Sequence, residues 1–355
     1  MNGTKSILLA GIGTAGSTIA REIRDAFDGN LRTIMCDTDA ATAQMCEPFV
    51  LLGGNRLAGR GAGGDIVAGR MAAEESISAI DSHLDGVRIA VIVTTLGGGT
   101  GGGATLETVK HLARKGIPSI VFATVPFTFE GDDRQRHARS VMRMIEDAAN
   151  ASFFIPLNDL AAETDNMKEA FDIARARLET GITFFWRLLE KPGYLRLDAE
   201  RLRNILSRAG HGRFTAVETS GENRAREALD RLLSSPAISG GTGAVRAILC
   251  GILAGDDLRL SEVGIVAGGL RKAFSEPLRF DLATVNDEES FGGRIAAVAM
   301  LFESTPEESS GNKPKSVLSG SGQKNDRFVK SEATIWHGEN MDEPTYLRKG
   351  ISLGF

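Results

Sequence analysis

The chain has 355 residues, which at roughly 100–200 residues per domain predicts two or three domains. With 42% hydrophobic residues, 25% charged residues and a net charge of −5, it has a globular composition and lacks the basic surface typical of general nucleic-acid or membrane binding. No apolar run reaches the roughly 20 residues of a membrane span, and three cysteines without a CxxC pair argue against a disulfide framework or a zinc site. We therefore expect a cytoplasmic protein with no direct nucleic-acid or membrane partner.

The first half of the chain alternates apolar runs with helical stripes. Ile19, Ile23 and Phe27 mark a helix over 17–27, and a second stripe of Leu106, Val109 and Leu112 marks another. Five apolar runs are typical of buried strands, at residues 5–10, 31–36, 87–95, 117–125 and 151–155. This alternation predicts an open α/β fold with a parallel sheet and with loops gathered at its carboxyl edge.

A long helical pattern follows over residues 167–189, and Lys191-Pro192-Gly193 ends it. Beyond it lie further strand-like and helix-like runs, with strands at 213–218, 245–253, 278–284 and 294–302 and helices at 223–233 and 261–274. These runs predict a second α/β domain that the long helix joins to the first. From residue 304 to about 340 the chain has little apolar content, which predicts a disordered linker. Residues 341–355 regain apolar side chains and are typical of a short docking peptide.

Two glycine-rich loops each join a predicted strand to a predicted helix. The first, Gly11-Ile12-Gly13-Thr14-Ala15-Gly16, suits an anion held at a helix N-terminus, although a glycine-rich turn without a ligand has the same pattern. Asp37 follows Gly16 by 21 residues, which is also the place of the ribose-binding acid in a dinucleotide oxidoreductase. Both interpretations stay open on this loop alone.

The second loop, Gly97–Gly103, holds six glycines around Thr100. Its run of exposed amides suits several phosphate oxygens, and a dinucleotide-binding fold has no use for a second phosphate loop of this length. No Gly-Lys-Ser/Thr ends it, so it is not a Walker loop. A third cluster, Gly59–Gly64, suits either a lid over a terminal phosphate or a flexible surface loop.

These loops, with further motifs, resemble the FtsZ/tubulin family of polymerising nucleotide-binding proteins. GGGTGGGA at Gly97–Ala104 is similar to the family's GGGTGTG phosphate loop, with Gly102 where the family has Thr. GAGGDIVAGR at Gly61–Arg70 resembles GAGANPEVGR, and PFTFEGDDR at Pro126–Arg134 resembles PFNFEGKKR. DEPTYLRKG near the end of the chain resembles the FtsZ-type peptide DIPxFLRxQ. The resemblance covers residues 5–303 and points to a branch near FtsZ.

The resemblance implies an α/β architecture in five segments: a Rossmann-like GTPase domain over 1–165, a central helix over 166–192, an activation domain over 193–303, a disordered linker over 304–340 and a docking peptide over 341–355. It implies GTP or GDP as the ligand, with Mg²⁺, and head-to-tail self-assembly into filaments. An adaptor or membrane-tethering protein would bind the docking peptide, held by Tyr346 and Leu347.

The same resemblance assigns nucleotide contacts to individual residues. Glu130 and Arg134 match the ribose and phosphate contacts of the family, or form an ion pair on an exposed loop. Phe171 matches the aromatic residue that packs on the base, or packs in the core. The remaining implied positions are Gly11, Gly13, Gly16, Asp37, Gly63, Gly97, Gly98, Gly99, Thr100, Gly101, Gly102, Gly103 and Asn158.

The base site departs from the family pattern. FtsZ-type proteins read guanine with an Asn after the first glycine loop and an Asn-Asp pair on the central helix, and here those positions hold Ser17 and Arg175-Ala176. Guanine N1 and N2 are donors and need acceptors, whereas arginine supplies donors alone. Arg175 therefore either bonds O6 or N7 of the base or pairs with Asp172 or Glu179 on its own helix. GTP remains the expected ligand because the rest of the site is intact.

The loop after the central helix also departs. In the family this loop covers the nucleotide of the next subunit, and its acids position the attacking water. Asp198 keeps the first acid, whereas Arg196 replaces the Asn and Arg201 replaces the second Asp. We expect slow or absent hydrolysis, because arginine accepts no hydrogen bond from water. Two other outcomes stay open: Glu200 substitutes for the lost acid, or an arginine reaches the terminal phosphate.

Two classes of function remain. The chain is either a filament-forming nucleotide-binding protein or a non-polymerising regulator that binds or caps a related filament. A dinucleotide oxidoreductase is disfavoured by the second glycine loop.

Overall fold

The computed structural model describes the parts of the chain that carry the predicted core. Residues up to Gly311 form one compact unit and Asn312–Phe355 a second. In the second unit, the strands β11 (Ile335–Trp336) and β12 (Glu339–Asn340) pair antiparallel; the rest of the predicted linker and the docking peptide lie outside the described residues. The described residues are 6–27, 31–44, 47–162, 164–206, 210–239, 245–274, 279–303, 335–336 and 339–340.

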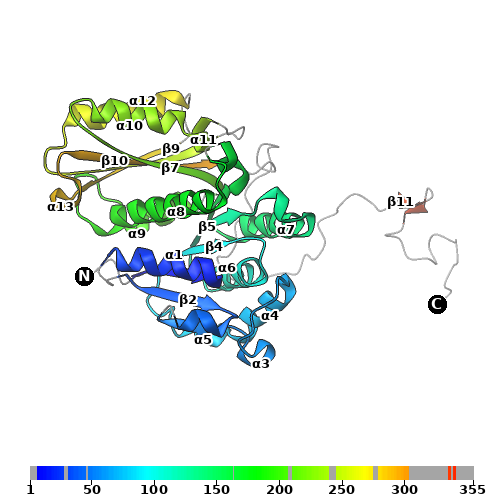
Figure 1. The fold of residues 1–355 in the computed structure, drawn as a ribbon. Helices are drawn as coiled ribbons and strands as arrows, with labels where there is room; N and C mark the ends of the chain where they lie inside the picture. Colours follow the sequence, from blue (N-terminus) through cyan, green and yellow to red (C-terminus); the bar gives the residue numbers. More distant parts are fainter. Residues whose placement is uncertain are drawn as a thin grey trace, which may run out of the picture. The chain divides into compact units, whose positions relative to one another are not determined.

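One mixed sheet organises the first unit (Figure 1). Across its described residues the ten strands run in the order β3-β2-β1-β4-β5-β6-β7-β10-β8-β9. Pairing is parallel from β3 to β7, antiparallel on both sides of β10, and parallel between β8 and β9. The strands are β1 Ile7–Ile12, β2 Thr33–Asp37, β3 Phe49–Leu51, β4 Ile89–Thr95, β5 Ser119–Val125, β6 Ala151–Pro156, β7 His211–Ser220, β8 Val245–Ala254, β9 Arg279–Asn286 and β10 Arg294–Glu303. The predicted α/β fold with a parallel-dominated sheet is confirmed.

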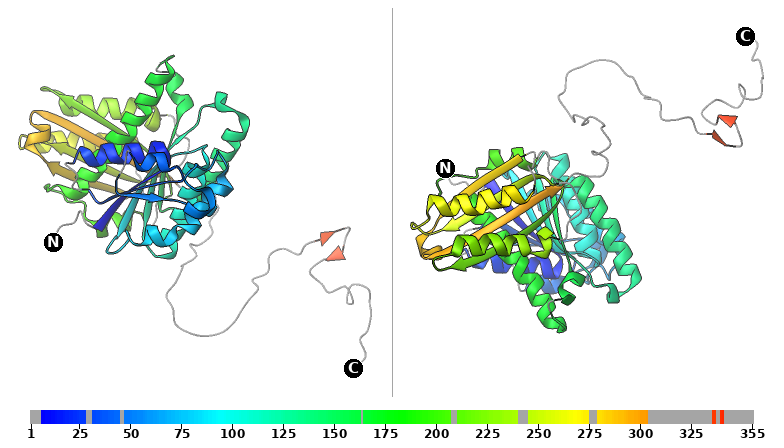
Figure 2. Two further views of the ribbon diagram at one scale, coloured as in Figure 1. Left: turned by 60° about the horizontal axis from the view of Figure 1, so that its bottom comes forward. Right: turned by 90° about the horizontal axis from the view of Figure 1, so that it is seen from above.

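Helices cover both faces of the sheet, as the two views of Figure 2 show. On β1, Leu9 packs in one core with α1 and α8, whereas Leu8 and Ala10 pack in another with α6 and α7. This alternation is the strand period of two, with each face buried under helices. The helices are α1 Gly13–Asp25, α2 Ala40–Ala43, α3 Gly54–Leu57, α4 Ile66–Glu75, α5 Ile77–Asp81, α6 Thr105–Arg114, α7 Asp132–Ala148, α8 Met167–Glu190, α9 Ala199–Leu206, α10 Arg224–Ser234, α11 Pro236–Ser239, α12 Leu260–Ala273 and α13 Glu288–Phe291.

Short helical turns complete the loops: the π-helical turn η2 (Thr100–Ala104) and the 3₁₀ turns η3 (Thr128–Glu130) and η4 (Leu157–Ala162). Among the described residues, none of the helices combines the length and apolar character that crossing a bilayer requires.

The long helix α8 crosses both halves of the sheet. It has 24 residues, begins after Asn166, whose side chain accepts from the Glu169 N–H, and ends at Lys191. Phe185 and Trp186 lie in a core that includes strands of both halves. A Cβ at Gly181 would lie 2.0 Å from the Phe214 ring, so glycine permits α8 to approach β7. The predicted second region is thus joined to the first by strand pairing as well, with Ser152 on β6 opposite His211 on β7.

Candidate functional site

A cavity of about 480 Å³ opens at the carboxyl edge of the parallel strands. Its wall comes from α1, the ends of β4 and β5, the first turn of α7 with the residues just before it, and α8. Open parallel sheets bind ligands at this edge. The lining residues are Ala15, Thr18, Ile19, Thr95, Leu96, Thr124, Pro126, Glu130, Arg134, Leu157, Phe171, Ala174, Arg175 and Leu178.

The first glycine loop turns tightly from β1 into α1 beside β4. A Cβ at Gly16 would lie 2.5 Å from the Val93 carbonyl oxygen, and one at Gly11 would lie 2.5 Å from the Gly16 carbonyl oxygen. Gly13 has a φ of +78°, and a Cβ there would lie 3.5 Å from the Gly101 nitrogen. The two glycine loops therefore meet, and Ala15 of the first faces the cavity.

The second glycine loop uses its glycines in two ways. A Cβ at Gly101 would lie 2.0 Å from the Thr95 carbonyl oxygen and one at Gly103 would lie 2.1 Å from that of Ile66, so both sites pack against backbone. Gly98, by contrast, has nothing within 4 Å of an added Cβ, and Gly102 has only ordinary contacts. The loop continues through the π-helical turn into α6, whose N-terminus carries partial positive charge.

The third glycine cluster lies against the second. Asp65 caps α4 by accepting from the Val67 and Ala68 N–H groups at 2.8 and 3.2 Å. A Cβ at Gly99 would lie 2.6 Å from the Asp65 carbonyl oxygen. Gly63 has a φ of +58° and open space around it. The structure therefore brings the three clusters together at the edge of the sheet.

Glu130 and Arg134 line the cavity and pair with each other. Arg134 Nη1 lies 3.0 Å from Glu130 Oε2, and Glu130 Oε1 accepts from the Phe127 N–H at 2.8 Å. Gly97, with a φ of +98°, packs beside Arg134. The ion pair expected from an exposed loop is present, and it lies at the glycine-loop end of the cavity.

Phe171 lies on the cavity wall at the N-terminal end of α8. Its side chain is 43% exposed, so the alternative of core packing does not describe it. Its ring meets Phe127 edge-on, with centroids 5.6 Å apart. The exposed part of the Phe171 ring is available to a ligand.

Arg175 lies one helical turn after Phe171 and also faces the cavity. Asp172 and Glu179 are near it at 3.8 and 3.7 Å, as the helical spacing predicts, yet its closest partner is Glu22 of α1 at 3.0 Å. Burial and a hydrogen bond with Glu22 raise the pKa of Glu179 to about 7. Nothing in the sequence pattern identified Glu22, because the contact joins two helices far apart in the chain.

Of the residues expected at the nucleotide, Glu130, Arg134, Phe171 and Arg175 line the cavity, whereas the loop glycines, Thr100, Ser17, Asp37 and Asn158 do not. Ser17 is fully buried and donates to the Gly11 carbonyl oxygen at 3.3 Å, while its neighbour Thr18 faces the cavity instead. The buried Asp37 carboxylate accepts from the Thr14 and Thr42 hydroxyls, both at 2.7 Å. Asn158 Oδ1 accepts from the Thr128 N–H at 3.1 Å. These side chains are already used to hold the loops around the cavity.

The loop after α8 lies at the far end of that helix from Phe171. Asp198 caps α9 by accepting from the Arg201 N–H at 2.8 Å, and Glu200 pairs with Arg88. Arg201 turns toward β9, with Nε 3.3 Å from Asp281 and Nη2 donating to the Leu282 carbonyl. Within the part of the chain that the structure describes, the exposed Arg196 side chain has no hydrogen bond or ion pair.

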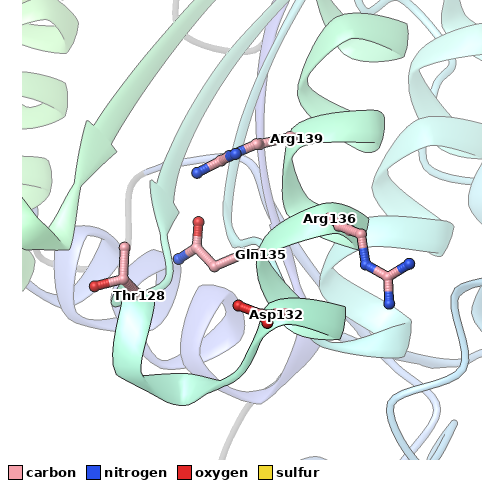
Figure 3. A pocket seen from close by; sticks show the side chains of 5 residues that line it. All are labelled: Thr128, Asp132, Gln135, Arg136 and Arg139. Atoms are coloured by element: carbon pink, nitrogen blue, oxygen red, sulfur yellow. The ribbon is translucent and has the colours of Figure 1, made fainter.

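A second cavity, of about 340 Å³, lies on α7 (Figure 3). Gln135 is buried and donates to the Pro126 carbonyl oxygen at 2.5 Å, and Arg136 pairs with Asp133 outside. Thr128, Asp132 and Arg139 complete the wall, with no glycine-loop residue among them. Among the described residues, no group of three or more His, Cys, Asp or Glu side chains is arranged to hold a metal ion.

Comparison with known proteins identifies similar sequences. Residues 6–164 match the sequence model of the Tubulin/FtsZ family, GTPase domain. The chain is 29% identical over 312 residues to cell division protein FtsZ 1 of Rhizobium meliloti, covering 86% of this chain but 53% of that protein, so it spans about half the length of this curated relative.

Solved structures of FtsZ and CetZ proteins share the fold. An empty FtsZ dimer from M. jannaschii has a TM-score of 0.77 at 23% identity, covering 90% of this chain and 95% of its own. A GTPγS-bound protofilament of CetZ2 from Haloferax volcanii has a TM-score of 0.70 at 21% identity, covering 86% and 96%. At this identity the likeness shows the fold alone.

Proposed function

We propose that this chain, whose residues 6–164 match the Tubulin/FtsZ family model, is a cytoskeletal nucleotide-binding protein that takes GTP or GDP in the 480 Å³ cavity. The observation that carries the proposal is a cavity lined by Arg134 and Phe171, beside which three glycine clusters pack against one another, with Gly97 next to Arg134. Phosphates would lie against the backbone N–H groups around Gly98, where an added Cβ meets open space, and the base against Phe171.

The residues present fit a triphosphate. Arg134 supplies a cation at the glycine-loop end, and the N-terminus of α6 adds partial positive charge. Asp37 would act indirectly, by holding Thr14 and Thr42 in place. Mg²⁺ would neutralise phosphate charge, with the phosphates and water as most of its ligands, because the described residues offer no cluster of acids for it.

We further propose head-to-tail assembly. The cavity and the loop after α8 lie at opposite ends of a helix about 36 Å long, so only a second copy stacked in the same direction brings them together. Such a contact does not close and gives filaments. Exposed apolar side chains occur at both ends: Phe129 next to the lining residue Glu130, and Tyr194 and Leu195 in the loop.

Hydrolysis in such a filament would be slow. Of the acids in the loop, Asp198 caps α9 and Glu200 pairs with Arg88, while Arg201 is held by β9. Asp198, whose second oxygen is not used by the cap, is then the acid available to position water.

We propose that residues 1–165, 166–192 and 193–303 act as nucleotide-binding domain, central helix and activation domain, and that residues 341–355 bind an adaptor protein.

The test follows sedimented polymer and released phosphate together, for the full chain with Mg²⁺ and GTP, ATP or no nucleotide. We expect polymer with GTP and little phosphate. Tyr194→Glu should abolish sedimentation and leave GTP binding unchanged, whereas the matched control Leu260→Glu, at a residue 88% exposed on α12, should change neither.

Deleting residues 341–355 should leave polymer formation and GTP binding unchanged and abolish adaptor capture. GTP binding without polymer at any concentration would favour the alternative, a regulator that binds or caps a related filament.

A further inference from the structure

Arg175 is the one cation at the Phe171 end of the cavity among the described lining residues. Because Phe171 and Arg175 are separated by one helical turn, they lie on the same face of α8. A planar ring placed against Phe171 therefore has its edge near the guanidinium group. Arg134, the other lining cation, lies at the glycine-loop end beside Gly97.

Three carboxylates hold the guanidinium group in place. Glu22 Oε1 and Oε2 accept from Nη1 at 3.0 and 3.3 Å, Glu179 Oε1 lies 3.7 Å from Nε, and Asp172 Oδ1 lies 3.8 Å from Nη2. None of these acids lines the cavity. The contact with Glu22 uses Nη1, whereas the acids near Nε and Nη2 lie beyond hydrogen-bond distance, so Nε–H and Nη2–H remain as two parallel donors for a ligand.

Acceptors are scarce at this end of the cavity. Among the described lining residues Glu130 is the one carboxylate, and it is bonded to Arg134 and to the Phe127 N–H. Apart from Glu130, Arg134 and Arg175, the lining side chains are apolar except for the hydroxyls of Thr18, Thr95 and Thr124. No carboxylate is therefore placed to accept from N1–H and the 2-amino group of guanine.

We propose that Arg175 selects the base by donating to the O6 and N7 atoms of a 6-oxopurine, with Glu22 as its positioning residue. This inference rests on the proposed nucleotide function of the same cavity. A guanidinium group bonds O6 and N7 of guanine with two parallel donors, whereas adenine presents a donor at N6. Hypoxanthine presents the same O6/N7 edge as guanine and lacks the 2-amino group. The chain should therefore accept inosine nucleotides about as well as guanosine nucleotides and reject adenosine nucleotides.

The test measures the affinity of the full chain for GDP, IDP, 7-deaza-GDP and ADP by isothermal titration calorimetry at a concentration below that of assembly. We expect IDP within about threefold of GDP, 7-deaza-GDP about tenfold weaker because one acceptor is lost, and ADP weaker by about 30-fold or more. Arg175→Ala should weaken GDP and IDP to the level of ADP while leaving ADP unchanged. Glu22→Gln should reduce the preference for GDP over ADP and retain binding. Arg226→Ala, at an exposed arginine of α10 paired with Asp230, is the matched control and should change nothing.

The outcomes separate this inference from the function on which it rests. If none of the four diphosphates binds, the nucleotide function itself is wrong. If they bind but GDP exceeds IDP by tenfold or more, the 2-amino group is read and the inference is wrong. Equal affinity for GDP and ADP in the unchanged chain, or an equal loss for all four ligands in Arg175→Ala, also overturns it, because Arg175 then acts on the shared part of the ligand.

Discussion

The two ends of α8 contrast in how their charged side chains are used. At the cavity end, Arg134 and Arg175 keep their side chains on the cavity wall while acids hold them from one side. At the other end, Arg201 is turned back onto β9 and Glu200 is paired with Arg88, so the loop contacts its own subunit. If the proposed function holds, the contrast predicts that nucleotide binding and nucleotide cleavage can be changed separately in this chain.

The largest effect is expected from a pair of glycines in the second loop. Gly101→Ala places a Cβ 2.0 Å from the Thr95 carbonyl oxygen, so the backbone must move; we expect a loss of about 3 kcal/mol or more in unfolding free energy, and loss of nucleotide binding. Gly98→Ala meets open space, so stability should be unchanged within about 0.5 kcal/mol while GTP affinity falls about tenfold. Urea denaturation and calorimetric titration measure both. Unchanged GTP affinity in Gly98→Ala would mean that the phosphates lie elsewhere.

The second prediction gives the loop after α8 the acidic residues that it lacks. Arg196→Asn combined with Arg201→Asp gives the loop the family pattern, so phosphate release in the polymer should rise about tenfold or more, equivalent to about 1.4 kcal/mol in the barrier. GTP affinity should not change, because neither residue lines the cavity of its own subunit. Losing the Arg201 contacts to β9 should cost about 1–2 kcal/mol of stability. Arg226→Asn serves as the control. If the variant folds and polymerises but its rate of phosphate release is unchanged, the assignment of this loop to hydrolysis is wrong.

The sequence predicted β1, β4 and β5 well because each is a continuous apolar run that is buried on both faces. It missed α7, whose buried stripe is only Gln135, Ala138, Val141 and Ile145 among charged residues. Phe171 lines the cavity and the glycine loops lie beside it, since the carboxyl ends of parallel strands meet; their contacts with a nucleotide stay a prediction. The sequence could not show that Ser17 bonds to the Gly11 carbonyl oxygen or that Asp37 bonds to neighbouring hydroxyls, because a motif position does not reveal the partners of a side chain. Glu22 could not be predicted, since its partner is 153 residues away.

The third prediction concerns the acids behind Arg175. The pKa of Glu179 is raised to about 7, so the folded state binds this proton more tightly than the unfolded chain does. Its contribution to stability is fully present below about pH 4.5, is lost as pH rises, and is gone above about pH 7. The contribution of Glu179 to the free energy of unfolding should differ by about 1–2 kcal/mol between low and high pH, because partial exposure of the side chain weakens the effect. Glu179→Gln should remove this part of the pH dependence in urea denaturation between pH 5 and 8, with Glu169→Gln as the control on the same helix.

The smallest expected effect is at Glu200, and it separates the two accounts of the covering loop. Glu200 and its partner Arg88 are both largely exposed, and exposed ion pairs contribute about 0–1 kcal/mol, so Glu200→Ala should barely change stability. If Asp198 is the acid that positions water, phosphate release should also stay within about twofold, whereas Asp198→Ala should lower it at least tenfold. The cap at α9 makes Asp198→Ala cost about 1 kcal/mol, so Asp198→Asn, which keeps an accepting oxygen for the cap, is the cleaner variant. A tenfold loss in Glu200→Ala would instead show that Glu200 leaves Arg88 when subunits stack and takes the place of the acid that Arg201 replaced.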